Sequence, residues 1–152
     1  FVAGVESGVA YQLPADDVRA LRNMFPHVVF RFGYRFSPRW EAGLIVGQEA
    51  FHETPGPDVD IDRIADYGGV VGYTYGYGAV YLRWTLASTM LQPYIELGAG
   101  ASSAAALGQL AIGVKAELVR NLDVYFSPAA LFHLKSETST KIGLHYGMSV
   151  RF

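Results

Sequence analysis

The chain lacks cysteine altogether and carries little net charge. Without cysteine it can form neither disulfides nor thiolate metal sites. The formal net charge is -2, which predicts no strong electrostatic attraction to nucleic acid. Although 51% of the residues are hydrophobic, no run of about 18 consecutive apolar residues occurs, so no transmembrane helix is predicted. Glycine and tyrosine are abundant instead, with 17 and 10 residues, in a chain of 152 residues that is long enough for one domain.

The stretch 141–152 alternates between apolar residues and small or polar ones. Its apolar set is Ile142, Leu144, Tyr146, Met148, Val150 and Phe152, and the set between them is Lys141, Gly143, His145, Gly147, Ser149 and Arg151. A period of two residues is typical of a β-strand with one apolar face. A strand that crosses a membrane in a barrel needs about 9–11 residues, apolar toward lipid and polar toward the lumen.

This stretch resembles the terminal strand of bacterial outer-membrane barrels. In that family the final phenylalanine and the apolar alternation before it are the signal that the barrel insertion machinery reads. The resemblance implies that the insertion signal here consists of Tyr146, Met148, Val150 and Phe152. An outer-membrane protein also needs a signal peptide, so we expect Phe1 to follow a cleavage site or further residues of the chain.

The same alternation predicts eight strands along the whole chain. We expect them at 1–12, 27–36, 40–51, 73–86, 92–101, 107–118, 122–133 and 141–152. The Pro-Tyr-Ile-Glu-Leu-Gly-Ala-Gly run at 93–100 looks like the corresponding strand of small OmpA-like barrels. The predicted fold is therefore all-β, a single domain of residues 1–152 that forms a transmembrane antiparallel up-and-down β-barrel. It resembles the small eight-stranded outer-membrane barrels (OmpA/OmpX/OmpW-like).

The predicted connections alternate in length. Those at 13–26 and 52–72 are long, those at 37–39, 87–91 and 119–121 are short, and those at 102–106 and 134–140 are intermediate. Outer-membrane barrels have short periplasmic turns and longer outer loops, so we expect both termini on the periplasmic side. Two local features are less regular. Asp16 can cap a short helix in the first connection, and Pro128 predicts a bulge or a loosened ladder.

The stretch 27–36 indicates that the polar face of the sheet lies inside. Large apolar residues, Val28, Phe30, Phe32, Tyr34 and Phe36, alternate there with Val29, Arg31, Gly33 and Arg35. In a soluble protein, a strand that pointed these apolar side chains outward and its arginines inward would bury the wrong face, whereas a membrane barrel directs the arginines into the lumen. A soluble lipocalin-like binder is therefore rejected, because it needs an apolar interior and the charged face here is the glycine-rich one.

On this assignment the lumen holds nearly balanced charges. The acidic members are Glu6, Glu41, Glu49, Glu96, Glu117 and Asp123, and the basic members are Arg31, Arg35, Arg83, Lys115 and Arg151. An eight-stranded barrel is just wide enough for its own side chains, and charges buried in it must be paired. We therefore predict a structural ion-pair network in a plugged lumen. A proton or ion path, and catalysis by paired carboxylates, are the alternatives.

Two other groups of residues invite a chemical interpretation. Outer-membrane lipid A deacylases use a His/Ser/acid set, but the spacing of His133, Ser136 and Glu137 does not reproduce it. Asp58, Asp60 and Asp62 resemble the start of a calcium loop, yet Arg63 and Gly69 occupy the positions where an EF-hand needs Gly and Glu. A solvated acidic loop, or a looser cation site that bridges lipopolysaccharide phosphates, remains. No catalytic, cofactor-binding or metal-binding residue is predicted.

The predicted function is that of a non-enzymatic integral protein of the bacterial outer membrane. Its lumen is plugged, and it acts as a scaffold or envelope-complex subunit through its extracellular loops. The alternatives are transport of small apolar molecules by lateral opening, as in OmpW-like proteins, and a lipid A-modifying barrel enzyme. The expected partners are outer-membrane lipid and lipopolysaccharide, the insertion machinery and other envelope proteins, and no nucleic acid.

Overall fold

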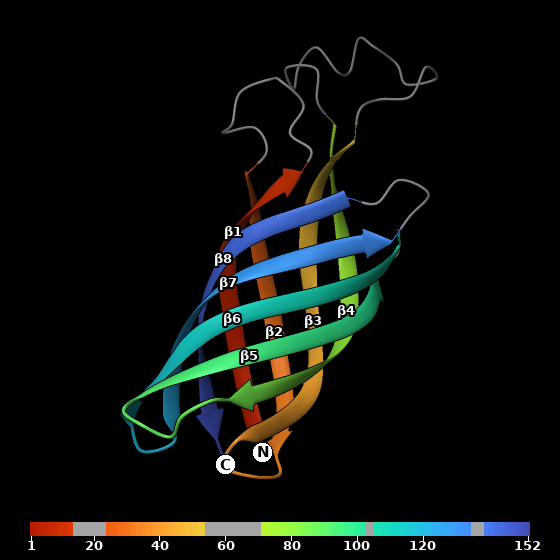
Figure 1. Cartoon of the computed structure of the whole chain (residues 1–152). Coiled ribbons are helices and arrows are strands. Elements are labelled where there is room, and N and C mark those ends of the chain that lie inside the picture. Colours follow the sequence, from red (N-terminus) through yellow and green to blue (C-terminus); the bar gives the residue numbers. More distant parts are fainter. Residues whose placement is uncertain (14–23, 54–70, 103–104, 135–138) are drawn as a thin grey trace.

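Eight antiparallel strands close into one barrel, which confirms the predicted fold class. The computed structural model describes residues 1–13, 24–53, 71–102, 105–134 and 139–152. The strands are β1 (Val2–Leu13), β2 (Met24–Arg35), β3 (Trp40–Glu53), β4 (Val71–Thr85), β5 (Leu91–Ser102), β6 (Ala106–Val119), β7 (Leu122–Leu134) and β8 (Ser139–Arg151). Each pairs with the next, and β1 pairs with β8 (Figure 1). None of the described residues forms a helix long and apolar enough to cross a membrane.

The strands extend further than the sequence predicts at the end of the barrel opposite the termini, called here the far end. The prediction placed 13–26 in a connection and started strand two at 27, but Leu13 belongs to β1 and β2 begins at Met24. Pro26 suggested a loop, yet it pairs with Val9 on the β1 side. The β2–β3 ladder starts only at the next residue, His27. Asp16, the predicted helix cap, lies outside the described residues.

The prediction is also too short for the β3–β4 hairpin. It ended strand three at 51 and placed the start of strand four near 73, whereas the ladder continues to Glu53 paired with Val71. The Gly/Tyr alternation that begins at 72 is therefore strand and not loop, because glycine and aromatic residues can alternate between the two sides of a sheet.

Pro128 does not shift the register of its strand. The β6–β7 ladder pairs Ala111 with Ala129 and resumes at Val114 with Phe126 on the same register, while β8 pairs regularly with Pro128. The prediction at this proline was a bulge or a loosened ladder. No bulge forms, and the loosened ladder is confirmed, because the β6 side skips the two pairs that would involve Pro128 and Ser127. The register shift of this hairpin lies near its turn instead, between Glu117 and Val119, where Asn121 has a φ of 72°.

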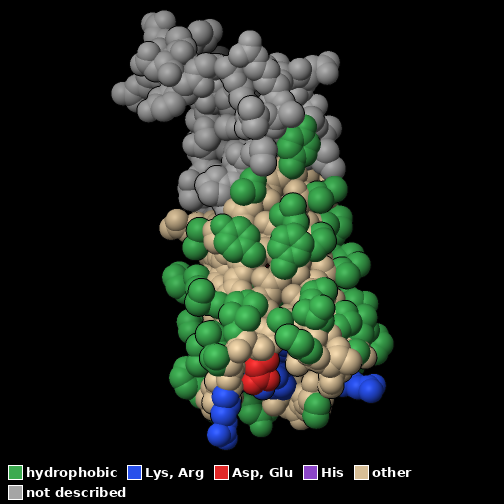
Figure 2. Space-filling view, turned by 90° about the vertical axis from the view of Figure 1, so that its left-hand side faces the viewer, with side chains coloured by type: hydrophobic (Ala, Val, Ile, Leu, Met, Phe, Trp, Pro, Cys, Tyr) green, Lys and Arg blue, Asp and Glu red, His purple; other side chains and the backbone are tan. Residues whose placement is uncertain are grey.

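The distribution of side chains is inverted relative to that of a soluble protein. Large apolar side chains of every strand are exposed on the outside, among them Phe30, Phe32, Leu44, Val80, Ile112 and Leu144. On the face seen in Figure 2, hydrophobic side chains are spread over the described surface and charged ones lie near the end that holds the termini, called here the terminal end. Trp40 and Trp84 stack at that end with ring centroids 5.8 Å apart, where an aromatic girdle meets the membrane interface.

Candidate functional site: the ion-paired lumen

Arg31 holds the middle of the lumen. It projects inward from β2, and its Nε donates to Glu6 Oε2 of β1 at 2.8 Å. Its Nη1 donates to Glu96 Oε1 of β5, also at 2.8 Å, so one guanidinium joins two carboxylates from different strands. Both carboxylates are fully buried, with exposed fractions of 0%. Charge-assisted bonds of this length are the strong kind, and they offset the cost of removing three charges from water.

Arg83 of β4 forms the second bridge and extends the chain of pairs. Its Nη2 lies 2.8 Å from Glu96 Oε2, and its Nη1 lies 3.7 Å from Glu41 Oε1. The same carboxylates accept neutral donors, since Tyr81 Oη lies 2.9 Å from Glu41 and Gln109 Nε2 lies 3.1 Å from Glu96. Each buried carboxylate is thereby held by several donors, as a satisfied polar core requires.

A second cluster lies at the terminal end of the lumen, around Asp123 of β7. Arg35 joins Asp123 to Glu41, at 3.5 and 3.2 Å. Lys115 of β6 and Arg151 of β8 contact the same aspartate, at 3.9 and 3.2 Å. The cluster is less enclosed than the central one, because Arg35 and Arg151 expose 21% and 26% of their side chains.

The prediction places Glu117 in the lumen, but its side chain is exposed at the rim, 2.6 Å from Arg151. The physical reason is its place two residues before the end of β6, at the mouth of the barrel, next to the turn where the Asn121 amide donates to this carboxylate at 3.3 Å. For Glu49 the structure describes only the backbone, which pairs with His27 and Tyr75.

Two further ionisable residues, which were not predicted to belong to the network, lie in the lumen. His145 of β8 is buried, with Nδ1 2.9 Å from Glu6 Oε1, and Lys141 is 1% exposed. The signal was present, since both lie on the inward half of the alternation at 141–152.

Tyrosine rings fill the space between the ion pairs. The Arg83 guanidinium carbon lies 4.3 Å from the Tyr94 ring centroid and 5.2 Å from that of Tyr125, which is cation–π geometry. The rings fit because glycines face them. A Cβ at Gly113 would lie 2.6 Å from Tyr94 Oη, and one at Gly147 would lie 2.6 Å from Tyr125 Oη. The glycine-rich inner face therefore makes room for the aromatic filling.

An apolar layer covers the central ion pairs on their far-end side. It consists of Val29, Ile45, Tyr77, Ala79 and Leu107, which are all buried and form one cluster with Tyr81. Along β2 and β4 these residues lie further from the terminal end than Arg31 and Arg83 do. The charges are thus surrounded by protein toward the far end as well as by the barrel wall.

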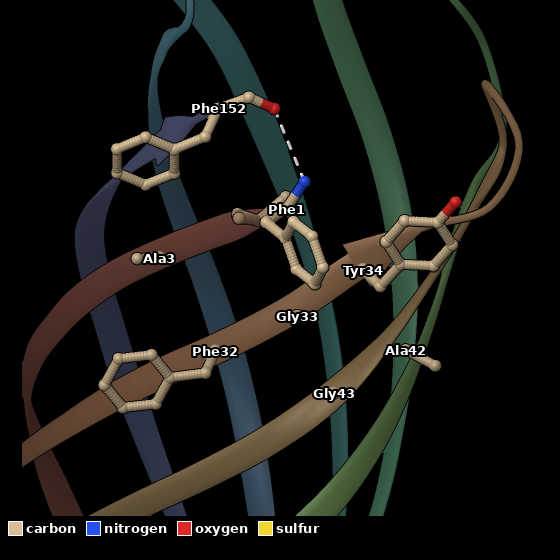
Figure 3. A pocket seen from close by; sticks show the side chains of 9 residues that line it. Phe1, Ala3, Phe32, Gly33, Tyr34, Ala42, Gly43 and Phe152 are labelled. Atoms are coloured by element: carbon tan, nitrogen blue, oxygen red, sulfur yellow. Dashed lines mark hydrogen bonds between the residues drawn. The ribbon is translucent and has the colours of Figure 1, made fainter.

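The outer wall carries shallow apolar grooves. The larger has a volume of about 370 Å³ and lies near the termini, where small residues such as Ala3, Gly33 and Ala42 leave a depression between larger side chains. Figure 3 shows Phe32 on one side of it, and Phe1 and Tyr34 together on the other, with ring centroids 5.5 Å apart. A second groove of about 270 Å³ lies over β3, β4 and β5. Lipid chains are the natural filling for such apolar depressions in a membrane-facing wall.

The predicted insertion-signal residues share the outer face of β8. Tyr146, Met148, Val150 and Phe152 are all exposed there, beside β1. His133, Ser136 and Glu137, which were weighed as a catalytic set, cannot be placed. The side chain of the first and the whole of the other two lie outside the described residues, as do Asp58, Asp60 and Asp62. Within the described part of the chain, no group of three or more His, Cys, Asp or Glu could hold a metal ion.

A closed eight-stranded antiparallel barrel with an apolar outside and an ion-paired inside is an integral outer-membrane β-barrel. Solved structures of this class match the chain over nearly its whole length. Neisserial surface protein A matches with a TM-score of 0.62 and 10% identity over 99% of this chain and 96% of that one. The attachment invasion locus protein Ail of Yersinia pestis matches with a TM-score of 0.56 and 12% identity over 99% and 98%. At these identities the likeness is one of fold. No protein-family model and no curated protein matches.

Proposed function

We propose that this protein is a non-conducting, non-enzymatic barrel of the outer membrane. It serves as a scaffold or as a subunit of an envelope complex, and it meets its partners at the far end. The observation that carries the proposal is the state of the lumen. Its central charges are buried at 4% exposure or less and are engaged with one another across the barrel.

This lumen is poorly suited to an ion path. An ion would have to displace Arg31 or Arg83 from carboxylates at 2.8 Å, and then pass the apolar layer at Val29 and Ile45. Breaking such a buried pair costs about 3–5 kcal/mol for each partner removed. A carboxylate that already accepts two cations is also a weak general base, because its lone pairs are in use. Both considerations favour a supporting role for the network over transport or catalysis.

The far end is where partners are expected. The β3–β4 hairpin extends furthest there, and the long segments 14–23 and 54–70 connect strands at that end. Outer-membrane barrels have short turns on the periplasmic side and longer loops outside, so we expect the far end to face outward. The proposed partners are lipopolysaccharide and other envelope proteins, while the insertion machinery acts on β8.

Two measurements test the proposal. The refolded protein in planar bilayers should give no stable conductance steps, and steps that persist in the pure protein would contradict the plugged lumen. The tagged protein, cross-linked in its native outer membrane and purified, should retain one or a few envelope proteins. Recovery of the barrel alone, under conditions that retain a known complex as a positive control, would contradict the subunit role.

A further inference from the structure

Arg39, in the β2–β3 turn at the terminal end, takes no part in the network of charges. Its side chain is exposed and makes no ion pair or hydrogen bond with any other residue that the structure describes. Its backbone is held, because the Arg39 amide donates to Ser37 Oγ at 3.3 Å and its carbonyl accepts from the Thr85 amide at 2.8 Å. Arg35 and Arg151 at the same end are both ion-paired. Arg39 therefore carries a positive charge that the described part of the chain leaves uncompensated.

This arginine lies at the depth of the lipid headgroups. The next residue, Trp40, stacks on Trp84 on the outer wall, where the two side chains are 37% and 40% exposed. Tryptophan rings of membrane proteins gather at the boundary between hydrocarbon and headgroups. Arg39 lies one residue beyond that boundary, within the turn that faces away from the hydrocarbon. Phosphate groups of the lipid are thus within reach of its guanidinium.

The apolar groove of about 370 Å³ lies on the hydrocarbon side of the same arginine. Figure 3 shows Ala3 and Phe32 toward one end of this groove and Tyr34 and Ala42 toward the other. Alternate residues of a strand share a face, so Ala42 and Trp40 both face outward on β3, and Arg39 follows three residues from Ala42, about 10 Å along extended chain. A lipid whose acyl chain leaves the groove at Ala42 therefore brings its phosphate past the tryptophan pair to Arg39.

We propose that this groove and Arg39 together bind one anionic phospholipid of the leaflet at the terminal end. One acyl chain occupies the groove over Ala3, Gly33 and Ala42, and Arg39 binds the phosphate, which a planar guanidinium can hold by two parallel hydrogen bonds. A headgroup with net negative charge is preferred to a zwitterionic one, because Arg39 lacks a counter-charge and a zwitterion brings its own cation. The inference concerns the outer wall and does not depend on the proposed function, which concerns the lumen and the far end.

A second copy of the chain is a poor occupant of the groove. Two copies related by a two-fold axis along the membrane normal present the same surface to each other at the same depth. A contact centred on the groove would place one depression against the other and leave both unfilled. It would also bring the two uncompensated Arg39 side chains together, and like charges across an interface are unfavourable. A flexible acyl chain with an anionic headgroup fits both the shape and the charge.

The chain's two tryptophans, Trp40 and Trp84, make the site measurable, because they stack beside it. The barrel is refolded into phosphatidylcholine vesicles in which a small fraction of the lipid is replaced by a brominated probe. One probe is phosphatidylglycerol brominated on its acyl chains near the headgroup, and the other is phosphatidylcholine brominated at the same positions. Bromine quenches indole fluorescence at contact, so the dependence of quenching on probe fraction gives the relative affinity of the two headgroups at this site.

The charge is tested by Arg39→Gln, with Arg120→Gln as its matched control. Arg120 is exposed in the β6–β7 turn at the same end and likewise makes no ion pair with a described residue, so both variants have the same net charge. Wild type and Arg120→Gln should prefer the phosphatidylglycerol probe by about threefold to fivefold, and Arg39→Gln should bind the two probes alike. Equal binding of both probes by wild type, or a preference that Arg39→Gln retains, overturns the inference. Equal loss in both variants would show general attraction to the surface and also overturns it.

The groove is tested by Ala42→Leu, which adds a larger side chain to it, with Ala116→Leu as the control. Ala116 lies on the outer wall of β6 near the terminal end, paired with Leu91 and Val124, away from the groove. Ala42→Leu should lose at least about half of the preference, whereas Ala116→Leu should keep it. An unchanged preference in Ala42→Leu overturns the groove as part of the site. Tryptophans shielded from both probes until the protein is diluted in lipid would make a second copy the occupant and overturn the assignment to a phospholipid.

Discussion

Arg31 on β2 reaches across the lumen to Glu96 on β5, with Nη1 and Oε1 2.8 Å apart. These strands are not neighbours in the barrel, so the pair connects opposite parts of its wall. The same guanidinium holds Glu6, and both carboxylates are fully buried.

Arg31→Ala should lower the free energy of unfolding by about 3–5 kcal/mol, because it leaves the buried Glu6 carboxylate without its arginine and the Glu96 carboxylate with Arg83 as its one remaining arginine. Urea unfolding of the barrel in lipid vesicles, followed by tryptophan fluorescence, measures the change. Arg39→Ala is the control, since Arg39 is an exposed residue of the β2–β3 turn and its loss should change stability by less than about 0.5 kcal/mol. Equal stability of both variants would show that the network does not support the fold.

Arg35→Ala should cost less than Arg31→Ala. Arg35 lies at the terminal mouth with 21% of its side chain exposed, so water can partly replace it at Glu41 and Asp123. Combining it with Glu41→Ala should recover part of the loss, with a coupling energy of about 0.5–3 kcal/mol in a double-mutant cycle. The recovery is incomplete, because Arg83 and Tyr81 also bind Glu41. Strictly additive losses would mean that Arg35 and Glu41 do not interact.

Two glycines of β6 should respond in opposite ways to alanine. A Cβ at Gly113 would lie 2.6 Å from Tyr94 Oη and 2.7 Å from Ser127 Cβ, whereas a Cβ at Gly108 would meet nothing within 4 Å. Gly113→Ala should therefore destabilise the barrel by about 1–3 kcal/mol through overpacking. Gly108→Ala should be neutral or stabilise by up to about 1 kcal/mol by restricting the unfolded chain. Chemical denaturation in the same vesicles gives both values, and a tolerated Gly113→Ala would show that the lumen has spare room.

Removal of Phe152 should reduce insertion in cells more than it reduces the stability of the finished barrel. The residue follows β8 at the terminal end of the barrel and is 83% exposed, so it contributes little to the lumen. Membrane yield from cells and urea unfolding of the refolded protein are the paired measurements. Normal membrane yield of the truncated chain would remove Phe152 from the insertion signal.

The orientation can be tested with single cysteines, because the chain contains none. A membrane-impermeant maleimide should label Asp60→Cys, between β3 and β4, on intact cells. Ser88→Cys, in the turn between β4 and β5, should be labelled only after the cells are opened. The reverse pattern would place the termini on the outside.

The sequence predicts some parts of this structure better than others, and the reasons are physical. The sorting of Phe32 to the outside and Arg31 to the inside needs only a period of two. The contact of Arg35 with Glu41 at 3.2 Å needs only the tight turn between them. The start of β2 was not predicted because proline is typical of loops. Pro26 can nevertheless lie in a strand, because a proline lacks only the N–H and its carbonyl can still accept a hydrogen bond.

Contacts across the lumen could not be predicted in the same way. Glu96 belongs to a strand far from Arg31 in sequence, and their meeting depends on the shear of the closed barrel, which alternation does not encode. Glu117 has the position that the alternation predicts, opposite Asp123, but it lies at the open end of β6, where solvent reaches its side chain.

Glu96 has a consequence for how the barrel forms. Its carboxylate accepts bonds from Arg31 of β2, Arg83 of β4 and Gln109 of β6, so three strands from different hairpins must be present before it is satisfied. An open sheet with some strands still missing would hold this charge without its partners, inside or beside lipid. Partly assembled forms are therefore high in free energy, and assembly should proceed in one concerted step that ends when β1 meets β8, with no stable half-barrel along the way.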